Sequence, residues 1–175
     1  MRIISGIYGG RTIQSPSGHK THPMSEKMRG AIFNALGDIK GLSFLDAYGG
    51  SGAVALEAIS RGATNVTAID SDKNAIQTIK ANAHALKADV KVTQVNISSW
   101  LDNNPGHCFD IIVADPPYNN VNKTHLYKLA KALNSGGVII YSLPPKEDIR
   151  LSDSYQILSE REYGDSRLVF YRFIG

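Results

Sequence analysis

The sequence predicts an α/β fold built on a doubly wound, mainly parallel sheet of seven strands. From residue 42 onward, apolar strand-like segments alternate with amphipathic helical segments, which is typical of parallel βα units. The tail has two strand-like segments with a turn at Gly164 and Asp165 and no helix between them, so it should form a C-terminal antiparallel hairpin. Two strand-like stretches around Gly9 and Gly10 predict a short N-terminal β-hairpin.

Local signals set the elements in chain order. Ser25 as an N-cap and Gly37 as a stop predict the first helix, over 25–36. The alternating part then predicts strands over 42–48, 65–70, 90–95, 109–117 and 136–144, helices over 51–62, 72–86, 96–103 and 122–135, and the terminal strand pair over 155–164 and 166–175.

Size and composition indicate one globular unit. The chain has 175 residues, of which 42% are hydrophobic and 20% charged. No apolar run reaches the ~18–20 residues that cross a bilayer, and the start lacks the apolar stretch of a signal peptide, so we expect a cytoplasmic protein. A single cysteine and five dispersed histidines predict no disulfide framework and no metal site.

Positive charge gathers at the N-terminus. The first thirty residues carry five basic residues against one acid, Glu26, whereas the remainder is nearly neutral. We therefore divide the chain into a basic hairpin arm, 1–22, and a main domain, 23–175. The charge indicates a polyanionic partner, although a solvated arm explains it equally well. The candidate phosphate contacts are Arg2, Arg11, Lys20, His22 and Arg29.

A glycine-rich loop follows the first parallel strand, at the sheet edge where α/β proteins bind ligands. Its glycines allow close approach of a ligand, and the next helix begins there with free N–H groups. Asp46 precedes the loop, and Asp70 ends the second strand, where it can accept the hydroxyls of a ribose. The loop residues proposed to bind the cofactor are Tyr48, Gly50, Ser51 and Gly52.

The glycine spacing leaves the nucleotide open. It fits the G-x-G-x-x-G/A pattern of dinucleotide sites, so a nicotinamide cofactor is one candidate. Asp46 favours S-adenosylmethionine (SAM), because a carboxylate there would repel a pyrophosphate but could receive the ammonium group of SAM. A tight turn capped by Asp70 is the purely structural explanation.

The most apolar strand runs into Asp115, Pro116, Pro117 and Tyr118. Two prolines end the strand and remove two N–H donors. The Asp115 carboxylate and the Pro116 carbonyl can then hold both N–H groups of a planar amine while Tyr118 stacks on the base. A carboxylate beside that nitrogen stabilises the positive charge that methyl transfer creates. The four residues therefore predict methylation of an amino group, and a rigid Pro-Pro turn capped by the acid is the structural alternative.

Asp-Pro-Pro-Tyr after a buried strand resembles the signature of amino-group N-methyltransferases, and the whole chain resembles the RsmD family, which methylates N2 of a guanine in 16S ribosomal RNA. The stretches that carry the resemblance are "MRIISGIYGGRTIQSPSG", "THPMSEKMRGAIFNAL", "FLDAYGGSGAVALEAISRGA", "ADPPY" and "REYGDSRLVFYR", in family order. The resemblance implies a Rossmann-like class I SAM-dependent methyltransferase with ribosomal RNA, bare or in the 30S particle, as its partner.

The resemblance also assigns residues. It implies that the loop after Asp46 binds SAM, that Asp70 binds the ribose, and that 115–118 is the catalytic tetrad. Asn96 stands where the family commonly has an acid that holds the adenine amino group, and its amide oxygen could accept the same bond. Gly49 replaces a usual alanine, and His22-Pro23-Met24 replaces a frequent Arg-Pro-Thr.

Other functions use the same features. Methylation of DNA adenine or cytosine, or of a protein glutamine, also needs an amino acceptor, but such enzymes usually carry more target-recognition sequence than this chain has. A non-catalytic RNA-binding assembly factor is the non-enzymatic alternative, and the intact tetrad argues against it.

Overall fold

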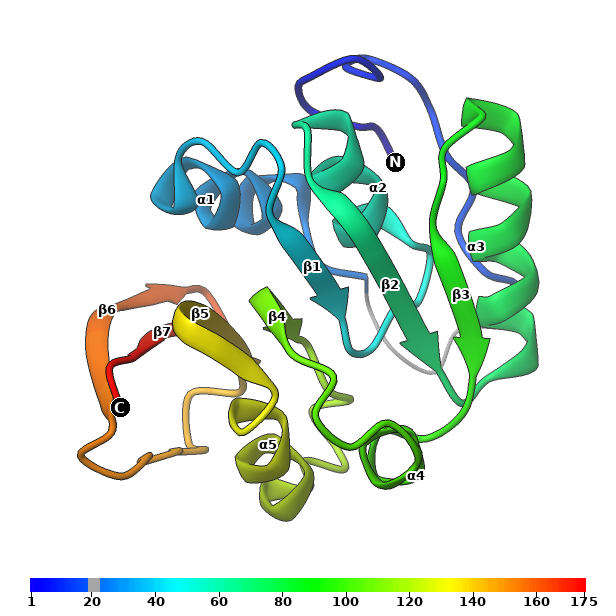
Figure 1. Ribbon diagram of the computed structural model, residues 1–175. Helices are drawn as coiled ribbons and strands as arrows, with labels where there is room; N and C mark the ends of the chain where they lie inside the picture. The colour runs from blue at the N-terminus through cyan, green and yellow to red at the C-terminus, as the bar shows by residue number, and fades with distance from the viewer. Residues whose placement is uncertain (19–22) are drawn as a thin grey trace.

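The computed structural model describes residues 1–18 and 23–175, and it confirms the predicted α/β fold (Figure 1). Seven strands form one sheet in the order β3-β2-β1-β4-β5-β7-β6, parallel from β3 to β5 and antiparallel from β5 to β6. No helix of the described part is long and apolar enough to span a membrane. The strands are β1 (Ser43–Asp46), β2 (Thr64–Asp70), β3 (Lys91–Gln94), β4 (Phe109–Ala114), β5 (Leu133–Leu143), β6 (Tyr155–Tyr163) and β7 (Ser166–Phe173), and the helices are α1 (Glu26–Leu36), α2 (Ala53–Ser60), α3 (Lys73–Leu86), α4 (Ile97–Asn103) and α5 (Lys123–Ala130).

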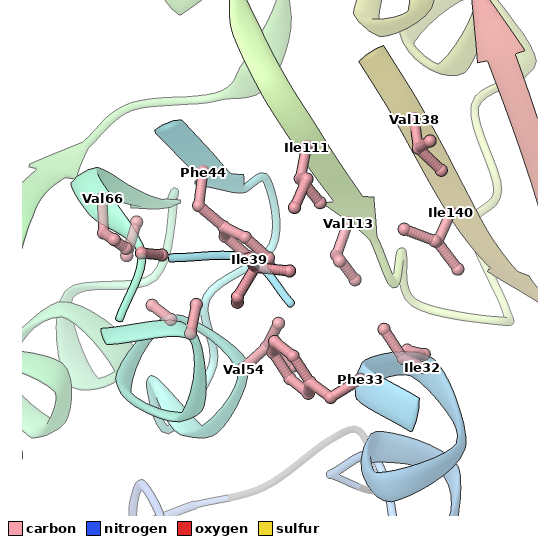
Figure 2. Packing of buried hydrophobic residues seen from close by; sticks show 14 of the residues in the cluster. Ile32, Phe33, Ile39, Phe44, Val54, Val66, Ile111, Val113, Val138 and Ile140 are labelled. Carbon is pink, nitrogen blue, oxygen red and sulfur yellow. The ribbon is translucent and has the colours of Figure 1, made fainter. Parts of the chain in front are cut away.

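Helices cover both faces of the sheet. On one face, α1, α2 and α3 pack on a buried cluster in which Phe33 of α1 stacks on Phe44 of β1 with ring centroids 5.9 Å apart (Figure 2). On the other face, α4 and α5 cover a second cluster through residues such as Trp100 and Leu126. Burial of apolar surface on both sides stabilises the sheet by about 25 cal/mol per Å², and it holds the strand ends in fixed positions.

The strand order reverses between β1 and β4. From β1 the chain proceeds outward to β2 and β3, and it then crosses to β4 and β5 on the other side. Asp46, the last residue of β1, pairs with Val113 of β4. The loops that follow β1 and β4 therefore diverge at a topological switch point, which is where this class of sheet binds ligands.

Most predicted boundaries agree with the structure within a few residues, and the cap of α1 is confirmed. Ser25 accepts a hydrogen bond from the N–H of Met28 (3.1 Å), and Gly37 ends the helix. The prediction of a helix over 122–135 was wrong at its end, because α5 stops at Ala130 and β5 begins at Leu133. Leu133 is drawn into the sheet by pairing with Phe109, the first residue of β4.

The N-terminal β-hairpin is reduced to one antiparallel bridge, between Arg2 and Thr12. Side chains of α2 hold this segment to the domain in place of a longer ladder. Glu57 accepts hydrogen bonds from the N–H groups of Ile4 (2.8 Å) and Ser5 (3.0 Å). Ile3 and Ile13 are buried, and the N–H of Gln14 donates to Asn82 of α3, so residues 1–14 are docked on the rest of the chain. The predicted boundary at residue 22 lies outside the described residues, and the division into an arm and a main domain stays a prediction.

The docked segment gives a first prediction, the effect of replacing Gly6 or Gly10 by alanine. Both have a φ of +82°, so alanine at either should cost about 1–2 kcal/mol from the left-handed backbone. A Cβ at Gly6 would lie 1.8 Å from the carbonyl oxygen of Ser60, whereas a Cβ at Gly10 meets nothing within 4 Å. We expect Gly6→Ala to lower the free energy of unfolding by about 1–3 kcal/mol more than Gly10→Ala. Equal effects in urea denaturation would show that the segment is not docked tightly.

Candidate active site

The loop between β1 and α2 adopts a backbone that favours glycine at two positions. Gly52 has a φ of +82°, and a Cβ there would lie 3.1 Å from Cγ2 of Ile79 in α3. Gly50 has a φ of +56° and donates its N–H to the Asp70 carboxylate (2.9 Å). The loop is therefore a tight turn that connects β1 to the N-terminus of α2 and is hydrogen-bonded to Asp70 at the end of β2.

Asp46 is a buried carboxylate at the end of β1. Its side chain is 2% exposed and accepts a hydrogen bond from the N–H of Ala55 in α2 (3.2 Å). Burial raises the pKa of Asp46 to about 7, and the nearby charges of Asp115 and Asp70 raise it as well. Among the described residues no cation pairs with Asp46. Asp46 is thus a buried carboxylate without a described counter-ion, and its role in receiving the ammonium of SAM stays a prediction.

Asp70 lies between the loop and α3. One carboxylate oxygen accepts the N–H of Gly50 and the other accepts the N–H of Asp72, each at 2.9 Å. The capping role considered from the sequence is thus present in the structure. Each oxygen keeps a further lone pair, so binding of a ribose by Asp70 stays a prediction compatible with this geometry.

The other three predicted cofactor residues, Ser51, Asn96 and Tyr48, differ in solvent exposure: Ser51 is buried, Asn96 is exposed and Tyr48 is half-buried. Ser51 is buried, and its hydroxyl lies 3.3 Å from the sulfur of Met1. Asn96 caps α4, with its amide oxygen accepting the N–H of Ser99 (2.9 Å), so its predicted bond to adenine would share that oxygen. Burial raises the pKa of Tyr48 to about 12, which keeps its phenol neutral. The roles of all three in cofactor binding stay predictions.

The predicted catalytic tetrad follows β4 at the same end of the sheet. Burial raises the pKa of Asp115 to about 6, and the Ser142 hydroxyl opposes that shift. Pro117 uses its carbonyl in a turn, accepting the N–H of Asn120 (3.0 Å). The carbonyl of Pro116 accepts none of the hydrogen bonds found among the described residues. The predicted roles of the Asp115 carboxylate and the Pro116 carbonyl as acceptors for a planar amine are compatible with this geometry and stay predictions.

Ser142 is a site residue that the sequence did not reveal. It is fully buried near the end of β5, and its hydroxyl lies 2.6 Å from that of Tyr118. The buried Ser166 of β7 lowers the pKa of Tyr118, against the larger effect of burial. The contact with Ser142 fixes the hydroxyl end of the ring. A signal was present, since Ser142 is the polar residue in the apolar run Val138 to Leu143, but its relevance depends on the pairing of β5 with β4.

A second prediction concerns the Ser142 hydroxyl. Ser142→Ala should lower kcat for methyl transfer about tenfold, because loss of a buried hydrogen bond costs about 1 kcal/mol or more and releases the Tyr118 ring. It should also move the acid limb of the pH–rate profile upward, since the Ser142 hydroxyl lowers the pKa of Asp115. Tyr118→Phe removes the same bond but leaves that hydroxyl, so the limb should not move upward. An unchanged rate and profile in Ser142→Ala would contradict the assignment.

The proposed phosphate contacts divide into three groups. Arg29 is fully buried beside Glu57, with its Nε 3.6 Å from the carboxylate, and it also donates to the carbonyl of Arg2. The expectation that Arg29 contacts RNA is therefore wrong: a phosphate cannot reach a guanidinium with no exposed surface. Arg2 and Arg11 are exposed, and Arg2 pairs with Glu26 (3.4 Å). Lys20 and His22 lie outside the described residues.

Comparison with known proteins identifies the class of the fold. The fold matches a solved Thermus thermophilus structure, the 16S rRNA N2 G1207 methyltransferase (RsmC) in complex with AdoMet and guanosine, with a TM-score of 0.70 and 21% identity over 90% of this chain and 44% of that one. The fold is therefore that of the class I SAM-dependent methyltransferases. No cluster of His, Cys, Asp and Glu that could hold a metal occurs within residues 1–18 and 23–175.

The family follows from closer matches. Residues 1–172 match the family model described as conserved hypothetical protein 95. The Buchnera aphidicola protein named ribosomal RNA small subunit methyltransferase D is 30% identical over 164 residues, covering 91% of this chain and 86% of that protein. A solved Escherichia coli structure, provisionally described as the methyltransferase yhhF, has a TM-score of 0.89 and 27% identity over 99% of this chain and 98% of that one. The chain belongs to this family, the RsmD family, as its sequence predicted.

Proposed function

We propose that this protein transfers a methyl group from SAM to the exocyclic N2 amino group of a guanine in small-subunit (16S) ribosomal RNA. The observation that carries the proposal is the pairing of two strand ends. An acid followed by a free carbonyl and an anchored tyrosine ends β4, directly beside the buried Asp46 and the glycine loop of β1. A nicotinamide cofactor would leave the acid, the carbonyl and the tyrosine without a role.

The residues around the loop suit SAM. Asp46 would receive the ammonium group, and Asp70 would accept the ribose hydroxyls with its remaining lone pairs. The helix start after Gly52 lies beside an acid, which suits a zwitterionic ligand better than a pyrophosphate. When bound, SAM supplies a methyl group activated by a positively charged sulfur.

The tetrad would prepare the amine. A guanine N2 is a weak nucleophile because its lone pair is delocalised into the ring. Asp115 and the Pro116 carbonyl would each accept one N–H and turn the lone pair toward the methyl group, while Tyr118 stacks on the base. As the new N–C bond forms and the S–C bond breaks, positive charge develops on nitrogen, and the Asp115 carboxylate stabilises it and takes the proton, directly or through water.

Incubation with labelled SAM tests the proposal. The substrates are bare 16S RNA and 30S particles, both from cells that lack the modification, followed by analysis of the nucleosides. We expect label in N2-methylguanosine in at least one substrate. Label in a methylated adenine or cytosine, or in a protein glutamine, would replace the proposed acceptor, and the absence of label from both substrates would overturn the proposal. Because the domain is small, we expect it to recognise a folded shape instead of a long sequence.

A further inference from the structure

A groove of about 510 Å³ lies between α1 and the edge strand β6. Lys27 and Asn34 project from α1 on one side, and Arg161 and Tyr163 project from β6 on the other. Lys27, Asn34 and Arg161 are exposed, and Tyr163 is half-buried. The described residues form no ion pair with Lys27 or Arg161. Lys27 and Arg161 therefore line opposite sides of the groove as two cations without an ion-pair partner among the described residues.

The sheet register connects this groove to the catalytic acid. Ala114 pairs with Tyr141, so Asp115 follows in line with Ser142. Ser142 pairs with Leu168, and Leu168 pairs with Arg161. One row thus runs across β4, β5, β7 and β6 on the face that α1 covers. Three strand spacings of about 4.8 Å separate the first and last members of the row, so the backbone of Arg161 lies about 14 Å from that of Asp115.

Strand alternation separates the charges of β6. Arg161 pairs with Leu168, whose side chain is in the cluster under α1, whereas Glu160 pairs with Val169 of the opposite cluster. Glu160 is occupied there by Arg150 at 2.9 Å. The remaining acid of the groove, Glu26, is held by Arg2. The groove therefore presents net positive charge although β6 itself carries two glutamates.

The other side of the active site is acidic. Asp46 and Asp70 end β1 and β2 on that side, and the charges of Asp70 and Asp115 both raise the pKa of Asp46. A nucleotide whose base enters the pocket keeps a phosphate on each side, so its chain must leave over the surface. On the opposite side, the exposed cations Lys27 and Arg161 attract phosphates toward the groove.

We propose that the groove between α1 and β6 binds the single-stranded segment of RNA next to the target nucleotide, with Lys27 and Arg161 contacting its phosphates. Tyr163 offers a ring edge or face to a neighbouring base. This inference rests on the proposed function, since it names the path of the RNA that the same site would methylate.

Charge reversal of the two cations tests the groove. In Lys27→Glu/Arg161→Glu, the affinity for labelled 16S RNA should fall at least tenfold at moderate salt. The slope of log affinity against log salt should become shallower by about 1.4, because each phosphate of a single strand that a cation neutralises contributes about 0.7 to it. The matched control is Lys91→Glu/Lys131→Glu, which changes the net charge equally at exposed positions of β3 and the end of α5.

Controls and contradicting results complete the test of the groove. Binding of S-adenosylhomocysteine and the thermal midpoint should match those of the wild type, and Lys27→Ala/Arg161→Ala should show a smaller loss of RNA affinity in the same direction. Equal RNA affinity in the Lys27→Glu/Arg161→Glu variant and its control would overturn the proposal that the groove binds RNA. It would leave the proposed methyltransferase function intact. A loss confined to 30S particles and absent with bare RNA would show that the groove contacts a ribosomal protein, which also contradicts it. Failure of the wild type to methylate RNA would instead count against the proposed function.

Discussion

Replacing Asp115 by alanine should lower the rate of methyl transfer by about 10²–10³-fold, the usual cost of removing a preorganised group that stabilises developing charge. The dissociation constant for SAM should change less than about threefold, because Asp115 faces the amine in this mechanism. Single-turnover kinetics at saturating SAM and RNA would measure the rate, and calorimetry would measure the affinity. Asp153→Ala, at an exposed position after β5, is the control and should leave both unchanged.

The pH dependence gives an independent check on Asp115. Its pKa is raised to about 6 by burial, and the carboxylate is the form that accepts the N–H and the proton. At saturating SAM, kcat should therefore be constant above pH 7 and fall about tenfold for each pH unit below 6. A profile without an acid limb, or full activity in Asp115→Ala, would remove Asp115 from the mechanism.

Much of the fold could be predicted because its signals are local. Ser25 and Gly37 bound α1, and the apolar run over 109–114 is long enough to identify a buried strand without knowing its neighbours. The end of α5 could not be predicted in this way. Residues 131–135 have helical character, yet Leu133 joins the sheet because Phe109, more than twenty residues earlier in the chain, needs a partner.

In the candidate site, too, the residues identified by local sequence signals could be predicted, and those that depend on contacts between distant elements could not. Asp46, Asp70 and Asp115 lie at strand ends, and the rule that parallel strands place ligands there was sufficient to find them. Ser142 and the burial of Arg29 depend on contacts between distant elements. Arg29 in a basic segment suggested a phosphate contact, but its guanidinium is buried beside Glu57 of helix α2, which also pairs with Arg61. An isolated acid in an apolar helix is the sequence signal that could have indicated such a pair.

Asp46→Asn should weaken SAM binding by about 30-fold or more, because removal of one member of a desolvated charge pair costs about 2–5 kcal/mol. In the wild type, ionisation of Asp46 is linked to binding. Its pKa is raised to about 7 by burial, and the ammonium group of SAM favours the ionised form, so affinity should fall about tenfold for each pH unit below 7. In Asp46→Asn the affinity should be independent of pH over this range. Calorimetry between pH 5.5 and 8 measures both.

Ionisation of Asp46 should affect stability and SAM binding in opposite directions. It strengthens SAM binding, but it lowers the free energy of unfolding of the protein without ligand. Because the folded state holds the Asp46 proton more tightly than the unfolded state does, the free energy of unfolding contributed by this group falls as pH rises from about 4 to about 7. At pH 8, Asp46→Asn should therefore be more stable than the wild type, by at most about 4 kcal/mol, since it keeps an acceptor for Ala55 without a buried charge. SAM should stabilise the wild type more at pH 8 than at pH 6. If Asp46→Asn is less stable than the wild type at pH 8, the Asp46 carboxylate already has a favourable partner in the protein without ligand. That result would contradict its proposed role as an unpaired charge that binds the ammonium group of SAM.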